Sequence, residues 1–301
     1  MYTLLEILSL WEKNVIRLIS RYLPLLSLDT EKMPMDKEMR IKKKIRLNNA
    51  VMIIGLSGWG NAGDASTFTV KYLVNKLGAK KFGEIPHEKF HDYWIQRPMV
   101  LTQQGLIKSY VPPRNDLFYW RNKEGGRDLI LLLGFEPYLD WPKYTDNVLR
   151  LAKKMFVKRI YTIGGYLADI PQGIETPISA STNNKEILTE LGNTRLELTD
   201  YEGPTSIYSE ILWRGKGKKI DAVSLWCAVP IYVKGLYPKA AYFMINKIAQ
   251  LIGLEIDLKD LKDKAEAFKV ELETETMDQS QLHDLIESLR RHQEREPTYF
   301  G

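Results

Sequence analysis

The sequence is poor in cysteine and histidine. Cys227 is the only cysteine among 301 residues, so no disulfide can form within one chain. It stands in an apolar stretch, residues 225–229, that is typical of a buried strand, where a thiol serves as a small hydrophobe. We therefore expect a reducing, cytoplasmic setting. The four histidines are too few and too scattered to build a Ser/His/Asp or Cys/His catalytic set.

The main part of the chain, residues 48–301, also lacks an excess of basic residues, although the formal net charge of the whole chain is +5. Residues 1–47 hold ten Lys/Arg and six Asp/Glu, a net of +4, which leaves +1 for residues 48–301. A surface that binds nucleic acid neutralises phosphates with a concentrated basic face. The body of the chain has no such excess, so nucleic-acid binding is not expected.

The chain contains no long uncharged apolar run. Residues 2–28 have helical periodicity, but their charges recur too often for a membrane span, and no cleavage site marks a signal peptide. Three interpretations stay open. The segment is a helix that packs on the body or on a partner chain, or an extension that is disordered or precedes the true translation start, or a helix on a membrane surface. The apolar stripe of this segment comprises Leu4, Leu8, Trp11, Val15 and Leu18.

Strand-like and helix-like segments alternate in the body, residues 48–256, after the N-terminal helix and basic linker of residues 1–47. This alternation predicts a three-layer αβα fold, and hairpins between residues 99 and 120 predict a mixed sheet. Strands are expected at 129–133, 159–163 and 222–229, and helices at 141–155, 185–191, from Pro204 through Leu212, and at 238–252.

Residues 257–301 have a different character, because two apolar stripes, within 258–272 and 282–289, alternate with charged residues. This pattern predicts a C-terminal helical extension and a tail. The extension either packs on a neighbouring subunit or forms a lid on its own domain.

The most conspicuous motif lies between an apolar run, residues 51–54, and a helical segment that ends near residue 77. Gly58, Gly60 and Gly63 have the G-x-G-x-x-G spacing, and Glu84 follows 21 residues after the last glycine. This spacing is typical of a dinucleotide site, in which the turn admits a pyrophosphate and the acid binds a ribose hydroxyl. Trp59 places an indole where the phosphate would enter. Pro86 interrupts the segment around Glu84, which makes that segment a poor second strand. A purely structural turn is therefore the favoured interpretation.

His87, Glu88 and His91 match H-E-x-x-H, the spacing of a zinc protease helix. That motif needs several helical turns, whereas Pro86 precedes it and an extended segment follows. We therefore reject a metal site here, and expect no metal and no cofactor.

Several short motifs, in this order along the chain, resemble the proteasome assembly chaperone family. The likeness is to its second-subunit type and to the longer archaeal and actinobacterial relatives, and it spans about residues 48–272. The residues that carry it are Gly58 to Gly63, Phe90, Asp92, Tyr93, Arg97, Pro98, Gly134 to Pro137, Trp141, Tyr201 to Pro204, Leu225, Trp226, Val229 to Val233 and Pro238 to Ala240.

The resemblance implies a phosphorylase/hydrolase-like α/β domain without established catalysis, which forms homo-oligomers and binds proteasome α-type subunits. Such proteins are sometimes labelled ATP-grasp or carboxylate–amine ligases, but this chain lacks an obvious phosphate-binding lysine motif. A nucleotide-dependent enzyme that uses the glycine turn is the alternative. The motif and cleft residues that the resemblance implies are Gly58, Asn61, Gly63, Asp92, Arg97, Glu136, Trp141, Gly203 and Pro204.

Three further expectations follow from side-chain chemistry. Asn61 can hydrogen-bond the backbone at the start of the helix. Arg97 and Glu136 either form an ion pair near the turn or remain two solvated charges. The last residues, Tyr299, Phe300 and Gly301, resemble the tail with which proteasome activators dock between α subunits, although Phe300 lacks the hydroxyl of that pattern; a frayed terminus is the alternative.

Overall fold

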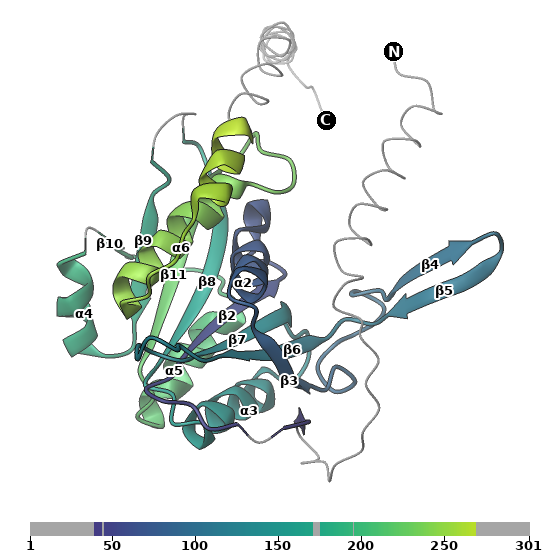
Figure 1. The fold of residues 1–301 in the computed structure, drawn as a ribbon, viewed down its shortest axis with the longest axis horizontal. Coiled ribbons are helices and arrows are strands. Elements are labelled where there is room, and N and C mark those ends of the chain that lie inside the picture. Colours follow the sequence, from purple (N-terminus) through teal and green to yellow (C-terminus); the bar gives the residue numbers. More distant parts are fainter. Residues whose placement is uncertain (1–38, 44, 171–174, 195, 269–301) are drawn as a thin grey trace, which may run out of the picture.

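The computed structural model describes residues 39–43, 45–170, 175–194 and 196–268, and its main feature is a nine-stranded mixed sheet (Figure 1). The strand order is β1-β3-β6-β7-β2-β8-β11-β9-β10. The strands are β1 (Arg40–Ile41), β2 (Val51–Ser57), β3 (Lys80–Ile85), β6 (Asn115–Trp120), β7 (Leu129–Phe135), β8 (Arg159–Ala168), β9 (Ile178–Thr182), β10 (Glu197–Leu198) and β11 (Ala222–Pro230).

The centre of the sheet is parallel and its flanks are mixed. β2 pairs in parallel with β7 and β8, and β8 pairs in parallel with β11. The pairs β6–β7, β3–β6, β1–β3 and β9–β11 are antiparallel. The four central strands β7, β2, β8 and β11 therefore end at one carboxyl edge, the edge at which open α/β sheets place their ligands.

Helices cover both faces of the sheet, which confirms the predicted three-layer αβα fold (Figure 1). On one face α2 (Ala65–Lys76) packs against α6 (Pro238–Ile252), and on the other α3 (Trp141–Lys154) packs against α5 (Ile207–Gly217). The short helix α4 (Lys185–Gly192) contributes Ile187 and Leu191 to the same core as α2 and α6.

Alternation along β2 builds both cores. Val51 and Ile53 join the core beneath α2 and α6, whereas Met52 and Ile54 join the core beneath α3 and α5. All four side chains are fully buried. A strand that is covered on both faces is apolar without interruption, which explains the run that the sequence shows at this position.

Two predicted boundaries were wrong. The helix expected to begin at Pro204 begins at Ile207, because the Ser206 hydroxyl accepts a hydrogen bond from the Tyr208 amide and caps the helix. The strand expected to end at residue 163 continues to Ala168, paired with β11 along its length. It continues because Gly164, which lacks a side chain, leaves room for the ring of Trp226: a Cβ there would lie 2.4 Å from it.

A separate hairpin, β4 (Met99–Gln103) and β5 (Leu106–Val111), projects from the body (Figure 1). Gln104 and Gly105 connect the strands, and both have positive φ angles, 51° and 76°. A two-residue loop with two positive φ angles twists in the sense that a hairpin requires. The structure thus confirms a hairpin in this region. After β5 the chain returns to the main sheet as β6.

The described part of the C-terminal extension packs on its own domain. Residues 259–268 are helical, Leu261 and Ala265 are buried, and Phe268 lies edge-on to Tyr237 with ring centroids 5.9 Å apart. Asp260 accepts hydrogen bonds from Tyr72 and Lys76 of α2. The stripe within 282–289, the tail Tyr299–Gly301 and the N-terminal segment 1–38 lie outside the described residues.

Within the described residues, no helix combines the length and apolarity that crossing a bilayer requires.

Candidate functional site

The glycine turn links the carboxyl end of β2 to α2, and its shape requires glycine at two positions. Gly63 has φ +57° and Gly58 has φ +146°, conformations that L side chains rarely adopt. A Cβ on Gly58 would also lie 2.7 Å from the carboxylate of Glu136. These glycines are thus needed for backbone shape and close packing.

Asn61 caps α2 with its side chain, as the sequence predicts. Its Oδ1 accepts hydrogen bonds from the backbone amides of Ser66 (3.1 Å) and Thr67 (3.0 Å), and its Nδ2 donates to Asp64 (3.2 Å). In a phosphate-binding turn, amides at the helix N-terminus point at the ligand. Here two of these amides already have an acceptor from the protein.

Glu136 follows β7 and binds the turn from the opposite side. One carboxylate oxygen accepts from the Trp59 amide (3.1 Å) and the other from the Ile207 amide at the start of α5 (2.8 Å). The side chain is buried, with the residue 9% exposed. A carboxylate at a helix N-terminus is stabilised by the helix dipole, so Glu136 needs no cation beside it.

Arg97 and Glu136 form no ion pair among the described residues, and Arg97 is exposed, as the interpretation of solvated charges expected for it. The Arg97 guanidinium lies over the ring of Trp94, 5.2 Å from its centroid. Glu136 is buried, whereas the sequence offered a pair or two solvated charges. The reason is tertiary: amides distant in sequence, at residues 59 and 207, supply the partners of this carboxylate.

The buried hydroxyls of Ser66 and Tyr208 lie at the end of β2, just before the glycine turn. The Leu56 amide donates to Ser66 Oγ (3.0 Å) and to Tyr208 Oη (2.9 Å), and the two hydroxyl oxygens lie 2.9 Å apart. Burial raises the pKa of Tyr208 above its ordinary value. Both side chains are fully enclosed, so no substrate reaches this pair. Nothing in the sequence pointed to it, because its members come from three different elements.

The indole rings of Trp59 and Trp226 contact each other at the glycine turn. Trp226 of β11 lies edge-on to Trp59, with ring centroids 6.2 Å apart, and edge-on to Tyr208 at 6.0 Å. Cβ atoms built on Gly60 and Gly164 would lie 2.8 and 2.4 Å from the Trp226 ring. Glycine at these two positions therefore makes room for an aromatic side chain of the protein.

Large hydrophobic side chains are exposed around this edge of the sheet, where four parallel strands end. We call these residues the carboxyl-edge rim. Exposed groups of large apolar side chains are typical of surfaces that bind other proteins. The rim comprises Trp59 in the turn, Tyr138 and Leu139 after β7, Tyr166 and Leu167 near the end of β8, and Ile231 after β11.

Glu84 lies far from the turn, because β6 and β7 separate β3 from β2. Although Pro86 argued against a second strand here, β3 does form and ends at Ile85, and it is antiparallel to its neighbour β6. Burial raises the pKa of Glu84, but hydrogen bonds and charge from Arg40 and Lys81 outweigh it and hold the pKa below its ordinary value. Glu84 and the glycine turn therefore do not form one dinucleotide site.

The H-E-x-x-H residues fold into a turn rather than a helix. Glu88 binds Arg40, and His91 is buried against Gln96 and Asn115. Burial lowers the pKa of His91 to about 4. The part of the chain that the structure describes contains no group of three or more His, Cys, Asp or Glu side chains placed to hold a metal ion.

The remaining motif residues shape loops near the turn. Asp92 accepts a hydrogen bond from the Trp94 amide (2.8 Å), and Trp141 Nε1 donates to the Pro137 carbonyl (2.7 Å). Gly203 has φ +157°, beside Tyr201, whose hydroxyl donates to the carbonyl of Pro204 (2.7 Å). The structure thus brings Gly58, Asn61, Gly63 and Glu136 together. Outside that group, Trp141 begins α3, and Asp92, Arg97, Gly203 and Pro204 lie in loops.

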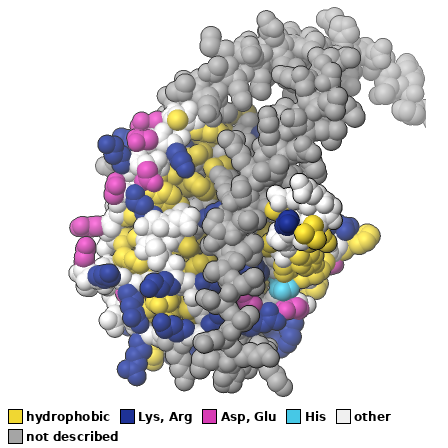
Figure 2. All heavy atoms as spheres, turned by 45° about the vertical axis from the view of Figure 1, so that its right-hand side comes forward, with side chains coloured by type: hydrophobic (Ala, Val, Ile, Leu, Met, Phe, Trp, Pro, Cys, Tyr) yellow, Lys and Arg dark blue, Asp and Glu magenta, His cyan; other side chains and the backbone are white. Residues whose placement is uncertain are grey.

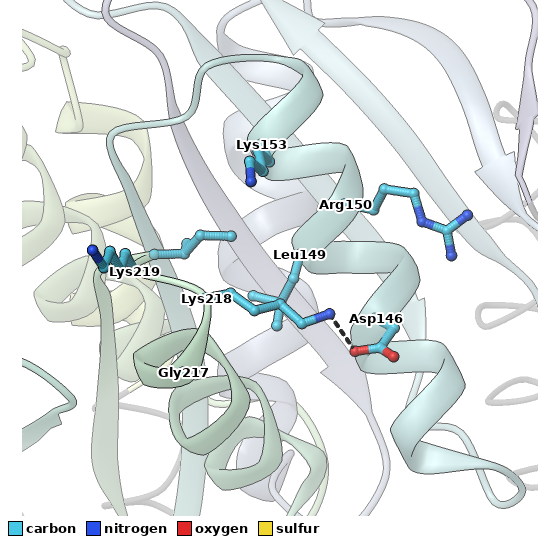
Figure 3. A pocket seen from close by; sticks show the side chains of 8 residues that line it. Asp146, Leu149, Arg150, Lys153, Gly217, Lys218 and Lys219 are labelled. Atoms are coloured by element: carbon cyan, nitrogen blue, oxygen red, sulfur yellow. Dashed lines mark hydrogen bonds and ion pairs between the residues drawn. The ribbon is translucent and has the colours of Figure 1, made fainter.

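A basic pocket of about 430 Å³ lies between α3 and the end of α5 (Figure 3). Its only carboxylate, Asp146, forms ion pairs with Lys218 (2.7 Å) and Arg214 (3.5 Å). The hydrogen bond from Lys218 holds the pKa of Asp146 below its ordinary value. The excess of cations suits an anionic group, and the sequence analysis missed this pocket. Its lining residues are Asp146, Leu149, Arg150, Lys153, Gly217, Lys218, Lys219 and Ile220.

Known proteins resemble the whole described domain. None of the curated protein sequences matches the chain. Among solved structures, a PAC2 family protein from Streptomyces avermitilis is 30% identical, with a TM-score of 0.69 over 75% of this chain and 95% of that one. A proteasome-assembly chaperone homologue from Mycobacterium tuberculosis is also 30% identical, with a TM-score of 0.69 over 74% and 94% of the two chains.

A more distant structure shows the same fold. An archaeal proteasome activator from Pyrococcus furiosus is 23% identical, with a TM-score of 0.63 over 79% of this chain and 98% of that one. The model of the PAC2 family matches residues 55–276, a span that includes the glycine turn, Glu136 and the rim. The resemblance that the sequence motifs suggested is thereby confirmed: the chain belongs to the PAC2 family.

Proposed function

We propose that this protein is a non-enzymatic chaperone-type protein that binds proteasome α-type subunits. One observation supports a binding role above the others: Glu136 occupies a backbone amide of the glycine turn, and Asn61 occupies two amides in the first turn of α2, where a nucleotide enzyme would receive a phosphate. The relative from Mycobacterium tuberculosis, a proteasome-assembly chaperone homologue, supports the kind of partner.

The carboxyl-edge rim is the surface proposed to make this contact. Its aromatic and aliphatic side chains are exposed at the end of a rigid sheet, and interfaces draw most of their binding energy from such anchors. Partner binding through the segment Tyr299–Gly301 is a second proposal, since two neighbouring aromatic residues after a polar stretch suit insertion into a pocket.

Binding to purified α-type subunits tests the proposal directly. We expect a complex in size-exclusion chromatography with light scattering, and we expect Leu167→Asp and Ile231→Asp in the rim to weaken it at least tenfold. The matched control is Phe156→Asp, which changes an exposed apolar side chain (79%, against 58% for Leu167 and Ile231) before β8, at the opposite edge of the sheet. Loss of binding after deletion of Tyr299–Gly301 would assign contact to the tail, and failure of the intact chain to bind would refute the proposal.

The rival function is a nucleotide- or dinucleotide-dependent enzyme that uses the same turn. A ligand at 100 times its Kd stabilises a protein by about 2.7 kcal/mol. We expect no thermal shift with ATP, NAD or NADP at millimolar concentration. A shift that Gly58→Ala abolished would favour the enzyme.

Self-association and a cytoplasmic location belong to the same proposal. Native mass measurement of the complex isolated from cells would report stoichiometry and partner together. A monomer without partners would contradict self-association and partner binding.

A further inference from the structure

The hairpin β4–β5 exposes more apolar surface than a two-stranded element can sustain in water. Its large hydrophobic side chains are between 44% and 65% exposed, and within the described residues its two strands pair only with each other. An isolated hairpin of this kind is marginally stable unless a helix or a further strand covers it. The exposed side chains are Met99, Val100, Leu106, Ile107 and Tyr110.

The exposed surface continues at the base of the hairpin. Trp94 is 79% exposed, and Ile95 beside it is also exposed. In Figure 2, where the right-hand side of Figure 1 comes forward, yellow hydrophobic side chains gather at the right of the molecule, where the hairpin projects. Lys108 is the only charged residue from 99 to 111, although exposed edge strands usually carry charges that prevent pairing. The hairpin therefore has the composition of a covered element.

The N-terminal segment enters the described structure next to β3 and the turn that follows it, the segment that precedes the hairpin in the chain. Arg40 in β1 pairs with Glu84 (3.1 Å) and also binds Glu88, which lies a few residues before Trp94 and the hairpin. Met39, the first described residue, is buried. The ten residues 29–38 can span about 33 Å when extended. Residues 2–28 are therefore tethered by a linker longer than either strand of the hairpin.

The chemistry of the two segments is complementary. Residues 2–28 have one apolar stripe, with Leu8 and Trp11 near its middle, and charges on the other sides. An amphipathic helix gains most of its stability by burying such a stripe. Pro24 is expected to end this helix, so residues 2–23 would be about 33 Å long, enough to lie along strands of about 20 Å.

We propose that residues 2–23 form an amphipathic helix whose apolar stripe covers the hairpin β4–β5 of the same chain. The helix supplies the third layer that the hairpin lacks, and the hairpin supplies the apolar surface that the stripe needs. This inference is independent of proteasome binding.

Hydrogen exchange of the full chain tests the packing. We expect Leu8→Asp, which puts a charge in the stripe, to accelerate exchange of the amides of residues 99–111 at least tenfold. Lys13→Asp, on the opposite side of the same helix, should leave their exchange unchanged. A chain that begins at Met33 should behave like Leu8→Asp, and it serves as a second variant should Leu8→Asp prove insoluble. Unchanged exchange in both the stripe variant and the shortened chain would overturn the proposal.

A disulfide between two introduced cysteines distinguishes the same chain from a second copy. The native Cys227 is fully buried and does not interfere. Trp11→Cys combined with Ile107→Cys should form a cross-link within one chain, which leaves the mass on a non-reducing gel that of a monomer. A cross-linked dimer, or protection of residues 99–111 that disappears on dilution, would show that a second copy covers the hairpin and would overturn the proposal.

Discussion

The carboxylate of Glu136 accepts a hydrogen bond of 2.8 Å from the backbone amide of Ile207, the first residue of α5. Its second oxygen accepts from Trp59 in the glycine turn. One buried side chain thereby holds together the end of β7, the start of α5 and the turn after β2. The backbone of the turn is therefore fixed in part by a carboxylate of the protein itself.

Removal of this carboxylate should destabilise the fold. We expect Glu136→Ala to lower the free energy of unfolding by about 2–4 kcal/mol, because two buried amides lose their acceptor. Glu136→Gln keeps one acceptor oxygen and should cost about 1–2 kcal/mol. Urea denaturation measures both, with Glu202→Gln, an exposed carboxylate, as the control that should change stability by less than about 0.5 kcal/mol. Equal effects at residues 136 and 202 would contradict the role of Glu136.

Gly58→Ala should be strongly destabilising, because the new methyl group would meet the Glu136 carboxylate at 2.7 Å in a backbone conformation with φ +146°. We expect a loss of at least about 2 kcal/mol in thermal or urea unfolding. Gly192→Ala is the control, since a Cβ there meets nothing within 4 Å, and alanine favours the end of α4. A neutral effect at Gly58 would mean that the turn is looser than its geometry indicates.

Ser66 and Tyr208 should show coupled effects on stability. Tyr208→Phe or Ser66→Ala alone leaves the Leu56 amide one hydroxyl acceptor, so each should cost about 1 kcal/mol. The double variant leaves that buried amide without an acceptor and should cost about 1 kcal/mol more than the sum of the two. A double-mutant cycle in urea measures the coupling. Strict additivity would show that the hydroxyls do not share this amide.

His91 should make the fold sensitive to acid. Its pKa is lowered from 6.5 to about 4 by burial, so the unfolded chain takes up a proton before the folded chain does. Stability from this group is intact above pH 6.5, falls as pH decreases from about 6.5 to 4, and then levels off, with a total loss of about 3 kcal/mol. Urea unfolding at steps of pH measures it.

The matched variants for this pH dependence are His91→Gln and His87→Gln. The first should weaken the fall in stability between pH 6.5 and 4, and the second, at a half-buried position in the same turn, should keep it. An identical pH profile for the wild type and His91→Gln would contradict the assignment.

Local sequence pattern was sufficient for most elements. The helix at 238–252 and the strand at 222–229 were predicted within a residue or two, because apolar periodicity reflects which face of each element is buried. The glycine turn and the Asn61 cap could also be predicted from the sequence, because they depend on neighbours within six residues. The start of α5 was misplaced because Pro204 satisfies the local rule for a first helical residue, whereas Ser206 provides the cap.

Family membership and the αβα architecture follow from patterns that the linear chain already contains. The partners of Glu136, the Ser66–Tyr208 pair and the distance between Glu84 and the glycine turn depend instead on strand order and on helices that meet across the sheet. A hydrogen bond between residues 71 positions apart leaves no trace in local periodicity. Each of the two segments has the same local pattern of apolar and polar residues whether or not the folded chain brings them together.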